Sequence, residues 1–341
     1  MHRTILITAA TGQVSSALIE ELDRTDRQLR VLVRDPSKAR SLGARGVEVY
    51  TGDLGDPFSL APALEGVSDL WLLTPNGPRA PEHSTNALWA ARRAGIERVV
   101  RMSAVGAAHD AATRSGRLHA LSDHELQQSG MCWTILRPHW FMQNLLGAAD
   151  EVAATGKLHL NMGNGRLGMI DVRDIATLAA YVLTDHPDRH HGQIYTPTGP
   201  RAISFAEVAN QLRQTIGNDV TYTLVTDQAA AANMLNRGIP DWTVGMLIEY
   251  AQAYASGWGD FVTTDFHDIT GRPPRSFAAF ARDHAHAFTP RSEPNDAAAA
   301  AYGQFAGDPA PDSDRAPEHP GAELEQQTGD AALRDCHAPA D

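Results

Sequence analysis

Short runs rich in Val, Ile and Leu recur through the first part of the chain, and a segment of helical character follows most of them. Apolar runs this short are typical of strands that are covered on both faces. Strands that alternate with helices predict a parallel sheet with helices on both sides. The predicted strands are Ile5–Ala9, Leu29–Val33, Val47–Tyr50, Leu70–Leu73, Val99–Met102 and Trp133–Leu136. We therefore expect an α/β fold built on a doubly wound parallel sheet.

The segments between these runs carry residues that begin and end helices. Asp35 precedes Pro36, which is the pattern of an N-cap followed by proline at the first helical position. Gly43, Gly95 and Gly130 stand where helices are expected to end. The predicted helices are Val14–Asp23, Pro36–Leu42, Ser59–Leu64, His83–Ala94 and Leu118–Gln128. We assign residues 1–138 to this sheet domain.

The alternation weakens after Pro138, and residues 139–289 predict a smaller, mostly helical region. Ser204 and Glu207 have the spacing of a capping box that opens a helix to about Ile216. A turn is expected at Gly163–Gly165. The other predicted helices are Trp140–Ala154, Arg173–Leu183, Asp227–Asn236, Trp242–Tyr254 and Ser276–Phe288. Residues 290–341 lack periodicity and are rich in Ala, Pro, Asp and Gly, so we expect a disordered tail.

The formal net charge of −12 is concentrated in this tail. Residues 292–341 contain eleven acidic residues and two arginines, so they carry nine of the twelve excess negative charges. The rest of the chain is nearly neutral, which argues against nucleic acid as a partner, because such faces cluster Lys and Arg. The expected partner is a small molecule.

Cysteine usage and hydropathy indicate a compartment. Cys132 and Cys336 cannot build a disulfide framework, which suits a reducing environment. The first apolar run is too short for a signal sequence, and no later run is long enough to span a membrane. We expect a cytoplasmic protein that does not insert into membranes. The pairs His190–His191 and His284–His286 lack further ligands at useful spacing, so we expect no metal site.

The turn between the first strand and the first helix has the position of a phosphate-binding loop. Backbone N–H groups and the helix dipole can hold a pyrophosphate there. Of the three glycines in a G-x-x-G-x-x-G pattern only Gly12 is present, because Ala9 and Ser15 occupy the outer positions. An ordinary strand-to-helix turn is the alternative interpretation. The expected cofactor contacts at this turn are Thr8, Ala10, Thr11, Gly12, Gln13 and Val14.

The residues that leave the second and third strands would face the adenosine half of a dinucleotide. An arginine after the second strand accommodates a 2′-phosphate, whereas an acidic residue selects the 2′-hydroxyl. Arg34 therefore indicates NADP (NADPH) rather than NAD, although an exposed arginine paired with Asp35 is the alternative. Asp53 and Leu54 are placed to contact the adenine, and a plain Gly-Asp turn is the alternative at that position.

These ordered motifs resemble the NmrA-like branch of the atypical short-chain dehydrogenases/reductases, which have an NAD(P)-binding Rossmann fold. The resemblance covers about residues 4–288. It rests on the opening turn, Leu32–Pro36, Gly52–Leu54, Trp133–Pro138, Phe141–Asn144, Asp171–Ala176 and Thr198–Val208. It implies that residues 1–138 bind the dinucleotide and that residues 139–289 lie on the substrate side. It also implies that Thr74, Pro75 and Pro138 lie against the nicotinamide, and that His139, Trp140, Phe141 and Asn144 wall a substrate pocket.

The chain departs from the family pattern at the proton donor. Short-chain dehydrogenases use a Tyr with a Lys four residues later, and neither Lys38 nor Lys157 has a Tyr four residues before it. His119 is the candidate acid, with Asp123 one helical turn further on to hold it. An exposed His and Asp pair is the alternative. Ser103, at the end of the fifth strand, is the candidate substrate-contacting hydroxyl, and a loop cap is its alternative.

Three functions remain open at this stage. The first is an NADPH-dependent oxidoreductase that reduces a small cyclic or aromatic carbonyl, enone or quinone, with catalysis resting largely on proximity. The second is a non-catalytic NADP-binding redox sensor. The third is a cofactor-independent isomerase or cyclase on the same fold, which the missing outer glycines motivate. The sequence identifies neither the substrate nor an oligomeric state.

Overall fold

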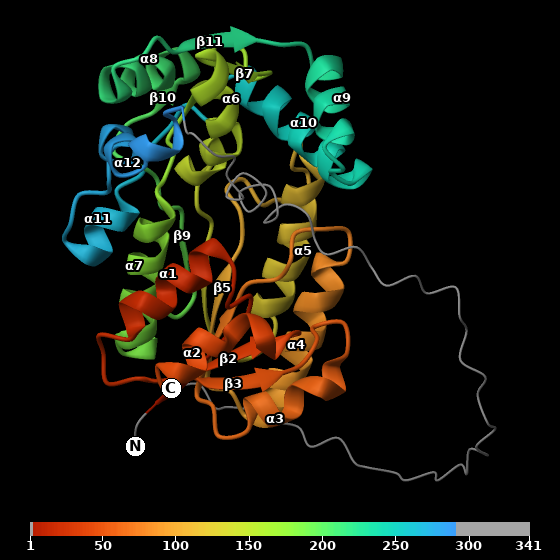
Figure 1. Cartoon of the computed structure of the whole chain (residues 1–341). Coiled ribbons are helices and arrows are strands. Elements are labelled where there is room, and N and C mark those ends of the chain that lie inside the picture. The colour runs from red at the N-terminus through yellow and green to blue at the C-terminus, as the bar shows by residue number, and fades with distance from the viewer. Residues whose placement is uncertain (1–2, 291–341) are drawn as a thin grey trace, which may run out of the picture. The chain divides into compact units, whose positions relative to one another are not determined.

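A seven-stranded parallel sheet organises the fold in the computed structural model, which describes residues 3–290 within one compact unit (Figure 1). The strand order is β3-β2-β1-β4-β5-β6-β9, and every neighbouring pair is parallel. The strands are β1 (Thr4–Ile7), β2 (Gln28–Val33), β3 (Glu48–Thr51), β4 (Asp69–Leu72), β5 (Arg98–Met102), β6 (Cys132–Leu136) and β9 (Gln193–Tyr195). The order reverses between β1 and β4, so the doubly wound prediction is confirmed.

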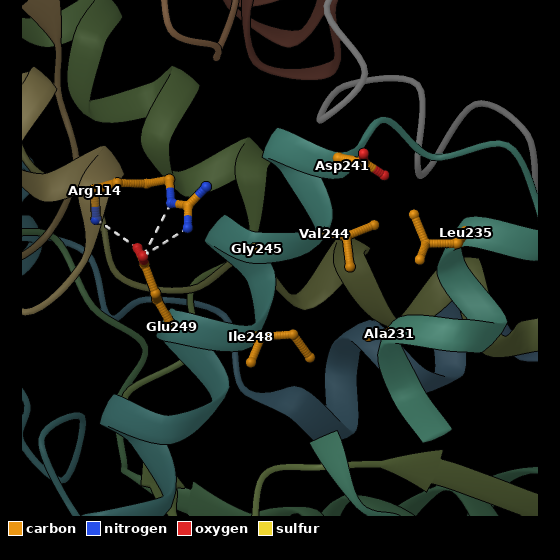
Figure 2. Close-up of a pocket in the computed structure, with 8 residues that line it drawn as sticks. All are labelled: Arg114, Ala231, Leu235, Asp241, Val244, Gly245, Ile248 and Glu249. Atoms are coloured by element: carbon orange, nitrogen blue, oxygen red, sulfur yellow. Dashed lines mark hydrogen bonds and ion pairs between the residues drawn. The ribbon is translucent and has the colours of Figure 1, made fainter. Parts of the chain in front are cut away.

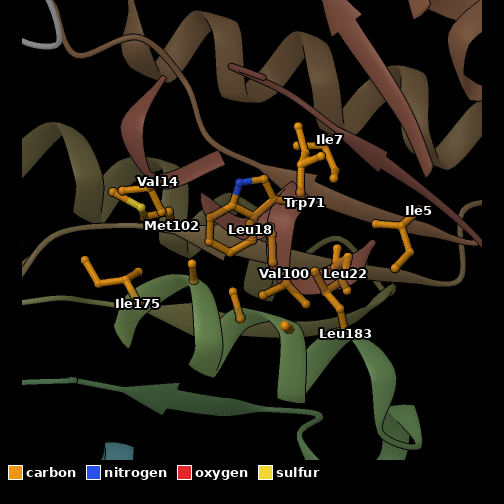
Figure 3. Close-up of a cluster of buried hydrophobic side chains, with 14 of the residues drawn as sticks. Ile5, Ile7, Val14, Leu18, Leu22, Trp71, Val100, Met102, Ile175 and Leu183 are labelled. Carbon is orange, nitrogen blue, oxygen red and sulfur yellow. The ribbon is translucent and has the colours of Figure 1, made fainter. Parts of the chain in front are cut away.

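Helices cover both faces of this sheet, as the apolar character of its strands requires. α1 (Gln13–Leu22) and α7 (Val172–Thr184) pack together on one face. Figure 3 shows Leu18 of α1, Trp71 of β4 and Val100 of β5 within the buried cluster on this face. The helices of the other face are α3 (Ala61–Leu64), α4 (Ala80–Ala94) and α5 (Arg114–Gln127).

A second buried cluster lies among the elements of the second half and contains Phe205, Tyr254 and Phe280. Its helices and their neighbours are α6 (Ala149–Thr155), α8 (Phe205–Ile216), α9 (Asp227–Asn236), α10 (Asp241–Ala255), α11 (Asp265–Thr270) and α12 (Phe277–Asp283). Two small sheets pair β7 (Lys157–Leu160) with β11 (Thr221–Leu224) and β8 (Arg166–Leu167) with β10 (Ile203–Ser204). The capping box of Ser204 and Glu207 opens α8 as predicted.

Several local predictions need correction. The helix expected from Trp140 begins at Met142 and is a 3₁₀ helix to Ala148 before α6 starts. The segment from Pro36 is a 3₁₀ helix to Ala39, followed by α2 (Arg40–Ala44), which contains Gly43 instead of ending there. The helix expected to reach Phe288 ends at Asp283. Other 3₁₀ turns are Pro57–Leu60, Pro187–Arg189 and Ala285–Ala287.

Some predictions fall outside what the structure tests. The division of the chain at residue 138 stays a prediction, and the expected disordered tail lies outside the described residues apart from Pro290. Among residues 3–290, no helix has the length and apolar character needed to cross a membrane.

Candidate functional site

The turn from β1 into α1 combines a strained alanine with an N-terminal glycine. Ala9 adopts φ +50°, a left-handed conformation that favours glycine, and it is the one non-glycine residue with positive φ between residues 3 and 290. Gly12 is the N-cap of α1, and its N–H donates to the carbonyl of Ala9 at 2.8 Å. The first glycine position of the motif therefore keeps a glycine-like backbone although it carries a methyl group.

Ser15 occupies the third glycine position and is fully buried. Its hydroxyl donates to the carbonyl of Thr8 at 2.9 Å and accepts from the indole N–H of Trp71 at 3.0 Å. The Thr8 hydroxyl in turn donates to the carbonyl of Leu73 at 2.8 Å. Ser15 thus ties α1 to β1 and β4 with hydrogen bonds at the place where glycine would allow close packing.

The residues of this turn fit a dinucleotide. A Cβ added at Gly12 would lie 3.2 Å from the carbonyl oxygen of Ala9, so the loop is tight where a phosphate would approach. The first turn of α1 has no acidic residue to repel an anion. The side-chain oxygen of Gln13 is buried and has no hydrogen-bond partner within the described part of the chain. Thr8, Ala10, Thr11 and Val14 complete the loop.

Charged side chains gather where the adenosine half of a dinucleotide is expected. Arg34 is exposed directly after β2, and Asp53 follows β3. His83, on the first turns of α4, has a buried Nδ1 with no hydrogen-bond partner among residues 3–290. Its pKa lies below the usual value because of burial first and then because of the Arg79 and Arg34 charges. His83 was not predictable from local sequence, because it lies far from Arg34 in the chain.

The Asp53 and Leu54 predictions separate in the structure. The Asp53 carboxylate accepts from the backbone N–H of Gly55 at 2.7 Å and shapes its own turn. Leu54 packs into the cluster below α4 and is 9% exposed. Asp53 is therefore available at the surface, whereas Leu54 contributes mainly to the core.

Asp123 is the centre of a buried charged cluster at the carboxyl ends of β5 and β6. Its carboxylate pairs with Arg101 and accepts from the Ser103 hydroxyl at 2.8 Å. The Arg137 guanidinium lies 2.9 Å from the same carboxylate. Two arginines thus share one aspartate, and the Ser103 proton is already engaged. Ser103 is 2% exposed, which suits a structural hydrogen bond more than a substrate contact.

His119 does not pair with Asp123 as the sequence predicted. Its Nδ1 lies 3.3 Å from the Arg101 guanidinium, which can only donate, so Nδ1 is an acceptor in a neutral ring. Burial, reinforced by the Arg101 and Arg137 charges, lowers the pKa of His119 to about 3. The reason for the mismatch is that arginines from β5 and β6 lie against this face of α5. A protonated His119 acid is therefore disfavoured at neutral pH.

The predicted nicotinamide contacts follow the strand ends. Thr74 and Pro75 come after β4, and Thr74 is 8% exposed while Pro75 lies at the surface. Pro138 is buried after β6, and its carbonyl accepts from the N–H of Val105 at 3.2 Å. These residues lie at the carboxyl edge of the sheet, where ligands bind in open α/β folds.

Of the four residues of the predicted pocket wall, His139 is buried and the other three are half-buried. His139 is 1% exposed, and its ring hydrogen-bonds the carbonyl of Gly259 at 3.1 Å and the N–H of Trp140 at 2.7 Å. Trp140 packs edge-on against Phe205 of α8, and Phe141 packs against the sheet cluster. Asn144 donates its backbone N–H to the carbonyl of Phe141 at 3.1 Å. The role of these four residues in substrate binding stays a prediction.

Aromatic rings from α10 and the segment after it face the carboxyl edge instead. Tyr250 and Tyr254 stack with centroids 5.9 Å apart, and Tyr254 stacks on His139 at 5.8 Å. Trp258 lies 5.3 Å from Tyr254 and packs against Gly106, where an added Cβ would come 2.1 Å from the indole. Gly106 belongs to the loop after β5. We call Tyr250, Tyr254 and Trp258 the aromatic roof.

Asn76 connects this roof to the sheet. Its side-chain amide donates to the Met246 sulfur of α10 at 3.1 Å, and its carbonyl oxygen lies 3.4 Å from the Ser115 hydroxyl of α5. The segment that contains Asn76 was expected near the nicotinamide, but its partners on α5 and α10 were not predictable from local sequence. The Met246 partner is 170 residues away.

An open apolar groove of about 560 Å³ lies between α9, α10 and the start of α5 (Figure 2). The Arg114 side chain lies across Gly245, and its backbone N–H and guanidinium both bind the Glu249 carboxylate. Ala231, Leu235 and Val244 form apolar walls. The Arg114–Glu249 contact joins α10 to the N-terminus of α5. Among residues 3–290, no group of three or more His, Cys, Asp or Glu side chains is arranged to hold a metal ion.

The sheet order and the phosphate-binding turn together define a dinucleotide-binding protein of the Rossmann type. A family model described as NAD(P)H-binding matches residues 9–186. The chain belongs to this NAD(P)H-binding family, and the family predicted from its motifs is confirmed.

Individual relatives cover the same part of the chain. An NAD(P)H azoreductase of Xenophilus azovorans is 38% identical over 288 residues, which are 83% of this chain and 99% of the relative. The crystal structure of the NADPH-dependent quinone oxidoreductase QOR2 of Escherichia coli with NADPH superposes with a TM-score of 0.75 at 28% identity, covering 82% of this chain and 99% of that one. NmrA, a negative transcriptional regulator solved with NADP, shares the fold, with a TM-score of 0.70 at 17% identity over 83% of this chain and 95% of NmrA.

Proposed function

We propose that this protein is an NADPH-dependent reductase of small, flat cyclic or aromatic acceptors such as quinones and enones. The observation that carries the proposal is the aromatic roof, whose Trp258 packs on Gly106 after β5, at the carboxyl edge of the sheet that the phosphate-binding turn serves. Tyr250 and Trp258 are its accessible rings, and the buried Tyr254 supports them. Apolar aromatic walls with a few polar groups suit a flat conjugated ligand. The relatives named above, an azoreductase and a quinone oxidoreductase, act on acceptors of this shape and support the proposal.

An acceptor of this kind needs no strong acid in the site. Bound NADPH would supply a hydride to the acceptor. A quinone or enone that accepts a hydride becomes a delocalised oxyanion, which water or a weak acid can protonate. The site therefore needs no Tyr-Lys pair, and Ser103 and the neutral His119 need not act as strong acids. Positioning by the crevice would account for most of the rate.

The preference for NADPH rests on Arg34. An exposed guanidinium directly after β2 suits the ribose 2′-phosphate, and no acidic side chain in the first turn of α1 opposes the pyrophosphate. The lowered pKa of His83 leaves its ring neutral, and Arg79 is paired with the Glu82 carboxylate at 2.8 Å, so Arg34 is the charge on which the preference depends.

Titration with both cofactors tests the proposal. The intact protein is titrated with NADPH and NADH by fluorescence and then assayed for NADPH oxidation with quinones, enones and azo compounds. Arg34→Ala should weaken NADPH binding about 10- to 100-fold and NADH binding little, since a charged hydrogen bond contributes about 1.5–3 kcal/mol. Arg213→Ala, a substitution on α8, is the control.

Three results would contradict the proposal. Equal losses for NADPH and NADH in Arg34→Ala would remove the 2′-phosphate assignment. Saturable NADPH binding without turnover on any acceptor would favour a non-catalytic NADP-binding redox sensor. Failure to bind either nucleotide would favour cofactor-independent chemistry.

A further inference from the structure

We propose that Asn76 and Tyr250 bind the oxygen atom of the acceptor and that Tyr250 donates the proton which completes its reduction. This inference rests on the proposed reductase function and names the groups that would replace the missing Tyr-Lys pair. It is carried by three features of the described residues: a weakly satisfied amide, a protonated phenol beside it, and an ion pair that fixes both helices.

The Asn76 amide has a poor hydrogen-bond partner. Its N–H group donates to the thioether sulfur of Met246, which is a weak acceptor. Its carbonyl oxygen faces the Ser115 hydroxyl at 3.4 Å, so the side chain is oriented with its N–H groups toward α10. A carbonyl or phenolate oxygen that entered the crevice would be a better acceptor than sulfur. The Asn76 amide is therefore positioned to replace its hydrogen bond to the Met246 sulfur by one to the acceptor oxygen.

The Tyr250 hydroxyl lies beside the N-terminus of α5. Burial raises the pKa of Tyr250, and the Ser115 and Thr113 hydroxyls oppose this effect only in part, so the phenol stays protonated at neutral pH. Thr113 is the N-cap of α5 and accepts from the N–H of Gly116 at 3.1 Å. The positive end of the α5 dipole would stabilise negative charge that develops at this hydroxyl or beside it.

The remaining contacts hold Tyr250 in place over the strand ends. Its ring stacks on Tyr254 at 5.9 Å and lies 6.4 Å from Trp258, which packs on Gly106 after β5. Met246, the partner of Asn76, precedes Tyr250 by one helical turn and so lies on the same face of α10. The Tyr250 hydroxyl and the Asn76 carbonyl oxygen also share a contact with the Ser115 hydroxyl, so the two side chains lie close together.

The Arg114–Glu249 ion pair positions the two helices. Each member is the immediate neighbour of a residue in the proposed site, because Arg114 precedes Ser115 and Glu249 precedes Tyr250. Backbone N–H and guanidinium bonds of 2.6 and 2.9 Å to one carboxylate fix the register of α10 against α5 (Figure 2). We regard Arg114 and Glu249 as positioning residues, since their contacts with each other leave them no direct role at the acceptor.

The reaction balances with groups already named. A hydride from NADPH brings two electrons to the acceptor, which is reduced to an oxyanion while the nicotinamide is oxidised. The O–H bond of Tyr250 then breaks as a new O–H bond forms on the acceptor oxygen. The partly exposed Tyr250 regains a proton from water. Asn76 donates a hydrogen bond to the same oxygen and stabilises its charge.

Binding of 4-nitrophenol in the presence of NADP tests the inference without turnover. This compound imitates a reduced aromatic acceptor, and its visible absorption distinguishes phenol from phenolate. In the wild-type protein the bound compound should ionise at lower pH than in solution, because Asn76 and Tyr250 stabilise the phenolate. Tyr250→Phe and Asn76→Ala should each weaken phenolate binding about 10- to 100-fold and return the ionisation toward its value in solution.

Matched controls separate this role from a structural one. Tyr222→Phe removes a partly buried hydroxyl that donates to the carbonyl of Gly163 at 2.9 Å in the second cluster, and it should change neither binding nor ionisation. NADPH affinity should stay unchanged in all three variants. In turnover with a quinone, Tyr250→Phe should lower kcat, and KM should change by a smaller factor. The alkaline limb of the pH profile of kcat should shift.

The outcomes distinguish the inference from the proposed function. Wild-type protein that fails to shift the ionisation of 4-nitrophenol, or Tyr250→Phe and Asn76→Ala variants that bind phenolate as the wild type does, would overturn the inference even if quinone reduction is observed. Loss of the shift in both variants, in a protein that reduces no acceptor, would support the oxygen site and refute the reductase function.

Discussion

In the phosphate-binding turn, glycine substitutions at Ala9 and at Ala10 should change the free energy of unfolding in opposite directions. Ala9 has φ +50°, which costs a non-glycine residue about 1–2 kcal/mol. Ala9→Gly removes this cost, but it also raises the conformational entropy of the unfolded chain, which lowers the free energy of unfolding by about 0.4–1 kcal/mol. We therefore expect Ala9→Gly to raise the free energy of unfolding by about 0.5–1 kcal/mol.

Ala10→Gly is the matched comparison. Ala10 is 2% exposed and lacks a positive φ, so its substitution loses a buried methyl group. That loss costs about 0.8 kcal/mol, and the unfolded-state term adds about 0.4–1 kcal/mol. Urea unfolding followed by tryptophan fluorescence should therefore separate the two variants by about 2 kcal/mol. Equal destabilisation by both substitutions would refute the argument that the turn forces Ala9 into a glycine conformation.

Two further predictions concern buried polar groups. Arg98 pairs with Asp69 in the interior and donates to the carbonyls of Val182 and Asp185 at the end of α7. Because Arg98→Ala removes all of these contacts and leaves Asp69 buried without this partner, it should lower the free energy of unfolding by about 3–5 kcal/mol. Arg45→Ala, which breaks the exposed pair with Asp23, should cost less than about 1 kcal/mol in the same urea assay, and similar losses for both would contradict the argument. Burial lowers the pKa of His139 to about 4, whereas an unfolded histidine titrates near about 6.5. Because the unfolded chain takes up the proton first, His139 should lower stability by up to about 3 kcal/mol as the pH falls through that window, and His139→Gln should flatten the pH dependence of unfolding; an unchanged slope would count against this assignment.

The sheet was predictable because β1, β2, β4 and β5 are buried almost throughout and therefore have short apolar runs. The less buried β3 and β6 carry runs of the same kind. The seventh strand, β9, was missed because its three residues are exposed or only partly buried and carry no apolar pattern. It joins the sheet through pairing with β6, which a local pattern cannot reveal. The 3₁₀ segment at Met142–Ala148 was read as part of an α-helix because the apolar residues of such short turns imitate helical spacing.

The candidate site was predictable where function depends on position along one strand or turn. Ala9, Ser15 and Arg34 were identified from spacing after β1 and β2. His119 and Asp123 have the correct helical spacing, but Arg101 of β5 contacts both side chains and takes the place of a direct bond between them. Tyr250 gave no signal, since its partners on α5 lie more than one hundred residues earlier in the chain.

Two groups of residues replace the missing Tyr-Lys pair. The arginine cluster, Arg101 and Arg137, provides positive charge, and Tyr250 of the aromatic roof provides the proton. A lysine beside the catalytic tyrosine supplies a positive charge that favours proton release. Arg101 and Arg137 supply positive charge at the strand ends, but Asp123 neutralises one of them, and a guanidinium does not release a proton in proteins. The cluster can therefore hold β5, β6 and α5 together and raise the local potential without transferring protons. Proton transfer then needs an O–H donor that is not bound to a carboxylate. Tyr250 of α10, whose hydroxyl lies beside Thr113 and Ser115 at the N-terminus of α5, meets that requirement, whereas the proton of Ser103 is held by Asp123.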